Sequence, residues 1–485
     1  MTAAPAARDE GLIRGVGLRG AVSINLISMI GIGPLITIPL VVGYLHGPLS
    51  LAGWLLGAVL ALCDGLVWAE LGSLFPGSGG TYGYLREVFG RHGVGRLLAF
   101  LFVWQTVFVA PLNQATGYVG FANYASYLAP PLARSSFGGT VLGTHWSISG
   151  IQLLAIAMGI VTVLALYRRI TMVSNIGILL GAASVVTLLC VIVASYARFS
   201  TVQALSLQPG DSFWLGLRAG LGQALIIAMY DYLGYNQSSC IGGEVREPAR
   251  TIPRSIVIAI AVVAVLYVSM QFGILGAIRW QSILPAADGS LPPLAQHVAS
   301  VVVEHSFGVG AALVVTLLIL ITAFASVYGN LLGYSRVPFA AARDGVFLRS
   351  FAHIHSSARF PDVSLLVMGL LALPFCLLNL GDIINWLTTG IVLIQSIAQI
   401  VALAVVRARR IAAPYRMSLY PVPALVALAG WSYVFLSAGT HAIVFGIATL
   451  LVGLFVYLIR ARLAHDWPFR SGATRSALDA GKETA

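Results

Sequence analysis

Long apolar stretches recur along the whole sequence and are separated by short segments rich in proline, glycine and arginine. A stretch of about 20 apolar residues is the length that crosses the hydrocarbon core of a bilayer as a helix. Only 9% of the residues are charged, 58% are hydrophobic and the mean hydropathy is +0.89, a balance that no soluble globular domain has. We therefore expect an all-α integral membrane protein with several transmembrane helices.

We expect about twelve transmembrane helices, because breakers such as Gly47-Pro48 and Arg168-Arg169 separate apolar segments of suitable length. Gly439 divides the last apolar stretch into two short helices rather than one long helix. The first span follows a tail without a small-residue cleavage site, so no removable signal peptide is expected. The expected spans lie near residues 21–44, 48–72, 97–123, 149–167, 173–195, 216–240, 255–278, 309–334, 363–380, 383–406, 421–440 and 442–460.

The basic residues are distributed unevenly among the expected loops. Of the 28 lysine and arginine residues, all but Arg134, Arg198, Arg218 and Arg279 fall in the two tails or in loops on the side of the N-terminus. Cytoplasmic loops of membrane proteins carry an excess of lysine and arginine. Both termini are therefore expected in the cytoplasm, in a multi-pass protein of the cell (inner) membrane. The net charge of +11 is then a signal of topology, and no nucleic-acid partner is expected.

The first apolar segment contains the sequence Gly31-Ile32-Gly33-Pro34, which disfavours a continuous helix. In hydrocarbon, freed backbone groups are tolerated only where protein or a water-filled cavity satisfies them. A kink in a packed helix would also fit these residues. However, a second interruption lies about 200 residues further on, at residues 232–239. Two broken segments in corresponding positions of two halves indicate the binding site of a transporter.

Five expected crossings separate the two interrupted segments, so the second segment begins on the opposite side of the membrane. A repeat with an odd number of spans must be inverted, and inverted repeats bring two broken helices together near the membrane midplane. The expected domains are an N-terminal tail (1–20), a first five-helix repeat (21–195), a second inverted repeat (216–406), two accessory helices (421–460) and a C-terminal tail (461–485).

Three loop motifs follow the expected second, sixth and eighth spans. They are AELGSLFPGSGGTYGY at residues 69–84, GEVREPARTIPR at residues 243–254 and SRVPFAAARDG at residues 335–345. In this order and at these helix ends, the motifs resemble those of the amino acid–polyamine–organocation (APC) superfamily of permeases. The resemblance extends from about residue 20 to about residue 410.

This resemblance implies two inverted five-helix repeats and a substrate held between discontinuous helices 1 and 6. A helix that restarts after a break offers partly positive N–H groups to a carboxylate. A helix that stops leaves carbonyl groups that suit an ammonium group, and an α-amino acid carries both groups. The candidate substrate-binding residues at the two breaks are Gly31, Ile32, Gly33, Pro34, Tyr230, Leu233, Gly234 and Asn236, together with the intramembrane acid Asp231; Asn113 beside Pro111 is a further candidate.

Two of these positions have a particular meaning in the resemblance. Ile32 stands where many relatives place a serine, so one side-chain donor is missing from the expected site. Tyr230 stands where relatives often carry an aromatic residue that stacks over the substrate, and its ring could make a cation–π contact. Ordinary packing of Tyr230 within its helix is the alternative.

Two acidic residues, Asp64 and Asp231, lie well inside expected spans, where an ionisable side chain is costly and usually functional. Both are candidates for ion or proton coupling. Asp231 lies within one turn of the second break and could carry a proton, bind a basic side chain or accept backbone hydrogen bonds. Glu70 lies nearer a span end and is expected to be a structural hydrogen-bonding residue.

The coupling ion stays open at this point. Some proton-coupled relatives use a lysine in span 5, but Gly181 stands there and the only lysine of the chain is Lys482. Sodium coupling would need oxygen ligands near span 8, where Ala325, Ser326 and Tyr328 provide only a few.

No catalytic or metal-binding pattern is present among the nine histidines, and zinc-type spacing is absent. The four cysteines, Cys63, Cys190, Cys240 and Cys376, are expected to be apolar core residues rather than disulfide partners. We therefore expect no enzyme, metal or cofactor.

The expected function is a secondary active transporter that moves amino acids by alternating access, coupled to protons or operating by exchange. A polyamine or organic amine permease is the alternative, followed by a membrane sensor or intramembrane enzyme. The expected partners are a small molecule and the lipid bilayer, and the sequence specifies no oligomeric state.

Overall fold

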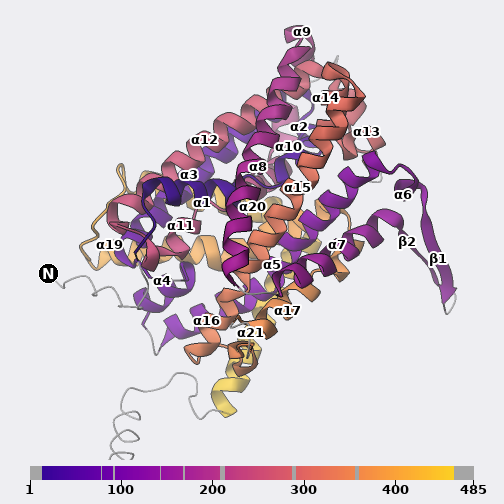
Figure 1. Ribbon diagram of the computed structural model, residues 1–485. Helices are drawn as coiled ribbons and strands as arrows, with labels where there is room; N and C mark the ends of the chain where they lie inside the picture. The colour runs from indigo at the N-terminus through magenta and orange to yellow at the C-terminus, as the bar shows by residue number, and fades with distance from the viewer. Residues whose placement is uncertain are drawn as a thin grey trace, which may run out of the picture.

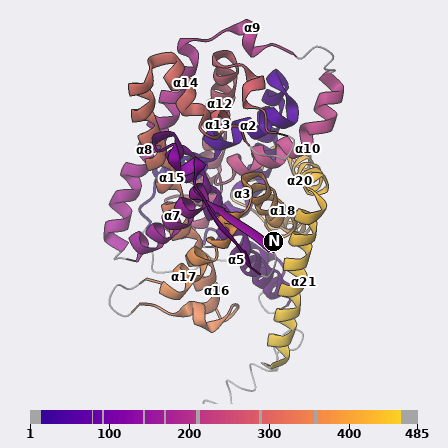
Figure 2. The same ribbon diagram turned by 90° about the vertical axis from the view of Figure 1, so that its right-hand side faces the viewer.

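The computed structural model describes residues 14–77, 79–90, 93–141, 144–167, 170–207, 213–286, 291–355 and 360–463. Helices make up most of this part and form one elongated bundle (Figures 1 and 2). Six helical stretches in it are long and apolar enough to cross a membrane. The number is seven if the bent pair α1 (Leu18–Met29) and α2 (Gly33–Leu45) is counted as one span. The chain is therefore a multi-pass, mainly helical membrane protein.

The long helices lie where the apolar segments predict them. Helices α20 and α21 lie on either side of Gly439, which confirms the expected division of the last apolar stretch. The count of twelve spans and the inverted repeats stay predictions. The long helices are α3 (Ser50–Leu74), α5 (Val94–Leu128), α7 (Gly150–Leu166), α8 (Ile170–Ala197), α10 (Phe213–Tyr232), α12 (Pro248–Ala277), α15 (Val309–Tyr334), α20 (Val422–Ser437) and α21 (Thr440–Leu463).

Besides the two interrupted segments, two further expected spans are not continuous α-helices. In the expected span 363–380, helix α17 (Asp362–Leu370) gives way to the 3-10 segment η5 (Pro374–Leu377). Pro374 explains the change, because proline has no N–H group to continue an α-helix. The expected span 383–406 consists of α18 (Leu380–Ile391), a π-helical segment η6 (Val392–Ile397) and α19 (Ala398–Ala408).

Several short elements were not expected from the apolar pattern. The antiparallel hairpin of β1 (Ser136–Val141) and β2 (Thr144–Ser149) means that the chain is not entirely helical, and the hairpin projects from the bundle (Figure 1). The remaining elements are single turns or short helices: η1 (Gly47–Leu49), α4 (Thr81–Val88), α6 (Pro131–Arg134), α9 (Thr201–Ala204), α11 (Gln237–Cys240), η2 (Gly242–Glu244), η3 (Trp280–Ile283), α13 (Pro293–Gln296), α14 (Val298–Phe307), α16 (Arg336–Arg343) and η4 (Arg349–Ala352).

Arginine side chains join loops from distant parts of the sequence at one end of the bundle. Arg86 on α4 forms an ion pair of 2.5 Å with Asp344, which follows α16. Arg460 on α21 donates a hydrogen bond of 2.7 Å to the carbonyl group of Gly345. Arg409, just after α19, donates one of 2.8 Å to a carbonyl group of α4. We call this end the arginine-rich end.

Glu70 on α3 is a fully buried acid near the arginine-rich end of the bundle. Its Oε2 atom accepts a hydrogen bond of 2.6 Å from Arg407 on α19 and one of 2.9 Å from the backbone N–H of Met417. These bonds confirm the expected structural role of Glu70. They tie α3 to elements more than 300 residues later in the sequence.

Candidate functional site

Helices α1 and α2 meet at a bend of 51°, with Ile30, Gly31 and Ile32 between them. The backbone N–H of Ile30 still bonds to Leu26, so α1 ends there in an ordinary helical turn. Helix α2 then begins with Pro34 in its first turn, where a missing N–H costs no hydrogen bond. The sequence therefore ends one helix and starts another inside a single apolar segment. The first turn of α2 presents partly positive N–H groups at the break.

The second break lies directly after α10. Residues 233–236 form a turn, and α11 follows as a single helical turn. Gly234 in this turn has a φ angle of +112°, a conformation that favours glycine. A Cβ atom on Gly234 would also lie 2.7 Å from the carbonyl carbon of Ser28 on α1. The glycine therefore permits the turn and the close approach of the two breaks.

Two side chains tie the breaks together by hydrogen bonds. Asn25 on α1 accepts a bond of 2.7 Å from the backbone N–H of Ser238 on α11 and donates one of 3.1 Å to its hydroxyl group. The hydroxyl group of Tyr267 on α12 lies 2.7 Å from the carbonyl oxygen of Met29 and 3.3 Å from that of Asp231. The last carbonyl groups of α1 and α10 thus converge on one hydroxyl group.

The carboxyl group of Asp231 lies against the first two turns of α2. Its Oδ2 atom accepts a hydrogen bond of 2.6 Å from the hydroxyl group of Thr37. Its Oδ1 atom is buried, has no hydrogen-bond partner in the described part of the chain, and occupies the space that a Cβ atom on Gly33 would need. Asp231 is only 3% exposed. A carboxylate in this position is favoured by the partly positive end of α2.

Tyr230 also approaches this turn of α2. Its ring carbon Cε1 lies 3.2 Å from the Cβ position of Gly33. Its hydroxyl group and that of Thr116 on α5 are 2.7 Å apart. Asn113 lies one turn earlier on α5 and donates a hydrogen bond of 3.4 Å to the hydroxyl group of Tyr334. Helix α5 therefore adds a polar face beside the breaks.

The residues of the first break point toward different helices. Ile32 is buried, and its Cδ1 atom lies 3.1 Å from the Cβ position of Gly120, so its side chain packs against α5. A Cβ atom on Gly31 would lie 2.6 Å from the hydroxyl oxygen of Ser326 on α15. Gly31 and Gly33 therefore bring α15 and Asp231 close to the break.

Asp64 contacts the second break from α3. Its Oδ2 atom accepts a hydrogen bond of 2.5 Å from the hydroxyl group of Tyr235, which belongs to the turn after α10. Asp64 is 1% exposed, and its Oδ1 atom has no hydrogen-bond partner among the residues that the structure describes. Asp64 thus contacts the turn after α10, whereas the carboxyl group of Asp231, just before that turn, bonds to Thr37 on α2.

The sequence did not single out several residues that the structure places at the breaks, among them Asn25, Thr37, Thr116, Ser238 and Tyr267. Of these residues, Thr37 could have been recognised from its position in the sequence. Thr37 follows Gly33 by four positions in an otherwise apolar segment, so its hydroxyl group lies on the face that the break exposes. Tyr267 lies in a long apolar run without such a marker. The sequence suggested Ser326 only as one of a few possible oxygen ligands for sodium.

No group of three or more histidine, cysteine, aspartate or glutamate residues could hold a metal ion within the described ranges. All four cysteines are free thiols; Cys376 is buried, and the other three are partly buried.

Comparison with protein families matches residues 17–459 to the family described as amino acid permease. The matched range contains both helix breaks and the helices around them. The chain belongs to the amino acid permease family. This result confirms the resemblance to the APC superfamily. Members of the family are transporters, in agreement with the expectation that the chain is not an enzyme.

Individual relatives match this amino acid permease over most of its length. The serine/threonine exchanger SteT of Bacillus subtilis (strain 168) is 26% identical over 458 residues, covering 93% of this chain and 97% of that protein. The large neutral amino acids transporter small subunit 2 of Rattus norvegicus is 26% identical over 434 residues, covering 86% and 75%. An uncharacterized transporter of Mycobacterium tuberculosis is 29% identical over 466 residues, covering 93% and 92%.

Proposed function

We propose that this permease is a secondary transporter that carries neutral α-amino acids across the cell membrane by alternating access, with both termini in the cytoplasm. The observation that carries this proposal is the meeting of two helix breaks around the Asp231 carboxyl group. The names of two relatives, a serine/threonine exchanger and a transporter of large neutral amino acids, support neutral amino acids as the substrate class.

The backbone at the breaks suits the two charged groups of an amino acid. The first turn of α2, from Gly33, supplies N–H groups for the substrate carboxylate. The carbonyl groups at the ends of α1 and α10, which converge on Tyr267, supply acceptors for the ammonium group. In this proposal the residues that line the site are Gly31, Ile32, Gly33, Pro34, Asn113, Tyr230, Asp231, Leu233, Gly234 and Asn236.

Asp231 connects substrate binding to coupling in this proposal. Its carboxyl group lies beside the first turn of α2, where the substrate carboxylate would bind, and two like charges so close together would carry a large electrostatic cost. A proton on Asp231 removes the repulsion. Amino acid and proton therefore bind together in one state and leave together in the other. Exchange without a net proton is the other coupling mode, and Asp64 is the second candidate carrier.

One observation favours a second function, transport of organic amines. Oδ1 of Asp231 is buried, has no partner in the described chain and faces the break. A charged Asp231 in this position would attract an ammonium group rather than a carboxylate. The two functions differ in whether the substrate needs a carboxylate.

Uptake by purified protein in proteoliposomes tests the proposed function. A panel of labelled serine, threonine, leucine, arginine and putrescine should show uptake of neutral amino acids and none of putrescine. The Asp231→Asn variant should still exchange a neutral amino acid but lose its stimulation by an inward proton gradient. Uptake of putrescine alone would establish the amine function. Neutral uptake that ignores the gradient in wild type would establish exchange as the coupling mode.

A further inference from the structure

One face of α12 changes from charged to apolar along its length. Arg250 and Arg254 lie one turn apart and are exposed. The same face continues at helical spacing with Ile258, Val262 and Val265, which are 40%, 40% and 70% exposed. Exposed apolar side chains on a transmembrane helix face lipid chains. The two arginines therefore lie where that lipid-facing stripe reaches the headgroup region.

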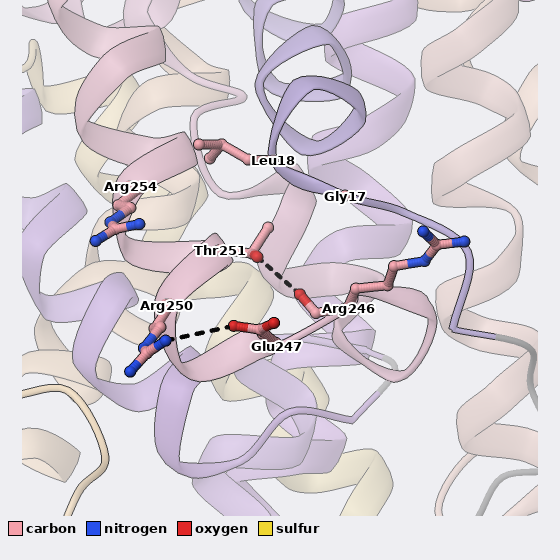
Figure 3. Close-up of a pocket in the computed structure, with 7 residues that line it drawn as sticks. All are labelled: Gly17, Leu18, Arg246, Glu247, Arg250, Thr251 and Arg254. Atoms are coloured by element: carbon pink, nitrogen blue, oxygen red, sulfur yellow. Dashed lines mark hydrogen bonds and ion pairs between the residues drawn. The ribbon is translucent and has the colours of Figure 1, made fainter.

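A pocket of about 320 Å³ lies at this position, between the beginning of α12 and the beginning of α1. Figure 3 shows that Arg250 and Arg254 extend to the same side of α12, whereas Arg246 extends the other way, along the segment that leads to Gly17. The residues that line the pocket are Gly17, Leu18, Arg246, Glu247, Arg250, Thr251 and Arg254. The pocket thus lies between two helix starts and has the guanidinium groups of Arg250 and Arg254 on one side.

The charge of this pocket is largely uncompensated. Glu247 is the one acidic residue among the described residues that line the pocket, and it forms an ion pair of 3.7 Å with Arg250. Both side chains of this pair are about three-quarters exposed, so the pair is weak. Arg246 donates a hydrogen bond of 3.1 Å to the carbonyl group of Arg14, which leaves its charge unneutralised. The first turn of α12 adds further partial positive charge.

We propose that this pocket binds the phosphate group of an anionic phospholipid, with Arg250 and Arg254 as its ligands. Arginine suits a phosphate group because its planar guanidinium group can donate two parallel hydrogen bonds. The lipid chains lie along Ile258, Val262 and Val265, which a free phosphate ion would not contact. Basic pockets between transmembrane helices at the cytoplasmic side are typical sites for such headgroups.

A lipid bound here would touch the beginning of α1, the helix that precedes the first break. The backbone of Val16 forms a parallel bridge with Val245, in which it donates to Glu244 (3.0 Å) and accepts from Arg246 (2.8 Å). A headgroup between the starts of α1 and α12 would strengthen this attachment. Because the break at Gly31 lets α1 tilt separately from α2, the lipid would favour the state in which α1 is attached to α12.

The test is thermal unfolding of the purified full-length protein in a neutral detergent, with added dioctanoyl phosphatidylglycerol, dioctanoyl phosphatidylcholine or inorganic phosphate. We expect a higher midpoint temperature with phosphatidylglycerol only. The double variant Arg250→Gln/Arg254→Gln should need about tenfold or more phosphatidylglycerol for half of the effect, because each arginine near an anionic lipid surface contributes substantially to binding. Glu247→Gln should need a few-fold less, because it removes the competing carboxylate.

The matched control is Arg349→Gln/Arg462→Gln, which removes the same charge from exposed positions on η4 and α21. It should respond as the wild type does. Equal responses of the wild type and the Arg250/Arg254 variant would overturn the proposal, as would equal effects of the two lipids. An equal effect of inorganic phosphate would show a site for the free ion and would overturn the assignment to a lipid. These binding measurements do not depend on the identity of the transported substrate.

Discussion

Thr37 donates a hydrogen bond of 2.6 Å to Asp231, and this bond joins the second turn of α2 to the last turn of α10. Both side chains are buried. Since the other carboxyl oxygen of Asp231 has no partner in the described chain, Thr37 is the main polar support of this acid. Leaving a buried polar group without its partner costs about 1–3 kcal/mol. The bond should therefore hold the two broken helices in their observed relationship.

Replacement of Thr37 tests this bond. Thr37→Val keeps the shape of the side chain and removes the donor, so it should lower the rate of amino acid uptake by about tenfold. Thr37→Ser keeps the hydroxyl group and should retain most of the activity. In a double-mutant cycle measured by amino acid exchange with Asp231→Ala, which removes the acceptor, the loss in the double variant should be smaller than the sum of the two single losses, because both substitutions remove one bond. Fully additive losses of exchange in proteoliposomes would show that the two residues act independently.

Gly33 should tolerate no side chain. In Gly33→Val the added atoms would meet Oδ1 of Asp231 and the ring of Tyr230, and would occupy the place proposed for the substrate carboxylate. We expect expression near the wild-type level and loss of uptake. Gly329→Val on α15 is the control, because a Cβ atom there meets nothing within 4 Å. Wild-type transport by the Gly33 variant would rule out the proposed carboxylate position.

The sequence was informative about the backbone of this site and much less about its side chains. Gly31, Gly33 and Pro34 disfavour the interior of a continuous helix, so the first break could be predicted from the local sequence. The role of Gly234 could not be predicted from the sequence, because its close approach to Ser28 depends on how two distant segments pack. Likewise, nothing near Thr37 or Tyr267 indicates that both would meet α10.

Tyr230 combines a ring next to Gly33 with a hydroxyl group bonded to Thr116. Tyr230→Phe should retain measurable uptake at a rate several-fold below wild type, because one neutral hydrogen bond contributes about 1 kcal/mol. Tyr230→Ala should abolish uptake, because it also removes the ring. Thr116→Val should match Tyr230→Phe if the bond between the two hydroxyl groups is what matters. Equal losses in the Phe and Ala variants would instead make the hydroxyl group the essential part.

Glu70 and Arg407 form a buried ion pair, and removing one charge should destabilise the protein. Glu70→Gln leaves Arg407 with an uncompensated charge, which typically costs about 3–5 kcal/mol. We expect a clearly lower midpoint of thermal unfolding in detergent. Glu247→Gln, which breaks the exposed pair with Arg250, should leave that midpoint nearly unchanged when no anionic lipid is added. Similar midpoints for both variants would contradict the structural role given to Glu70.

The family model covers the two breaks as part of one continuous match, but it carries no information about which residues touch the substrate. Ile32 illustrates the difference. The resemblance implied a binding position at Ile32 that lacks the side-chain donor of many relatives, and in the structure its side chain packs against Gly120 of α5. At this position the backbone rather than the side chain is what the break can offer to a ligand.

Competition between substrate analogues tests the central claim most directly, that two helix breaks recognise both charged groups of an amino acid. In proteoliposomes, uptake of a labelled neutral amino acid should be inhibited by the unlabelled amino acid. It should not be inhibited by the corresponding amide, which lacks the carboxylate, or by the corresponding amine, which lacks the whole carboxyl group. Inhibition by the amide or the amine as strong as that by the amino acid itself would contradict the account.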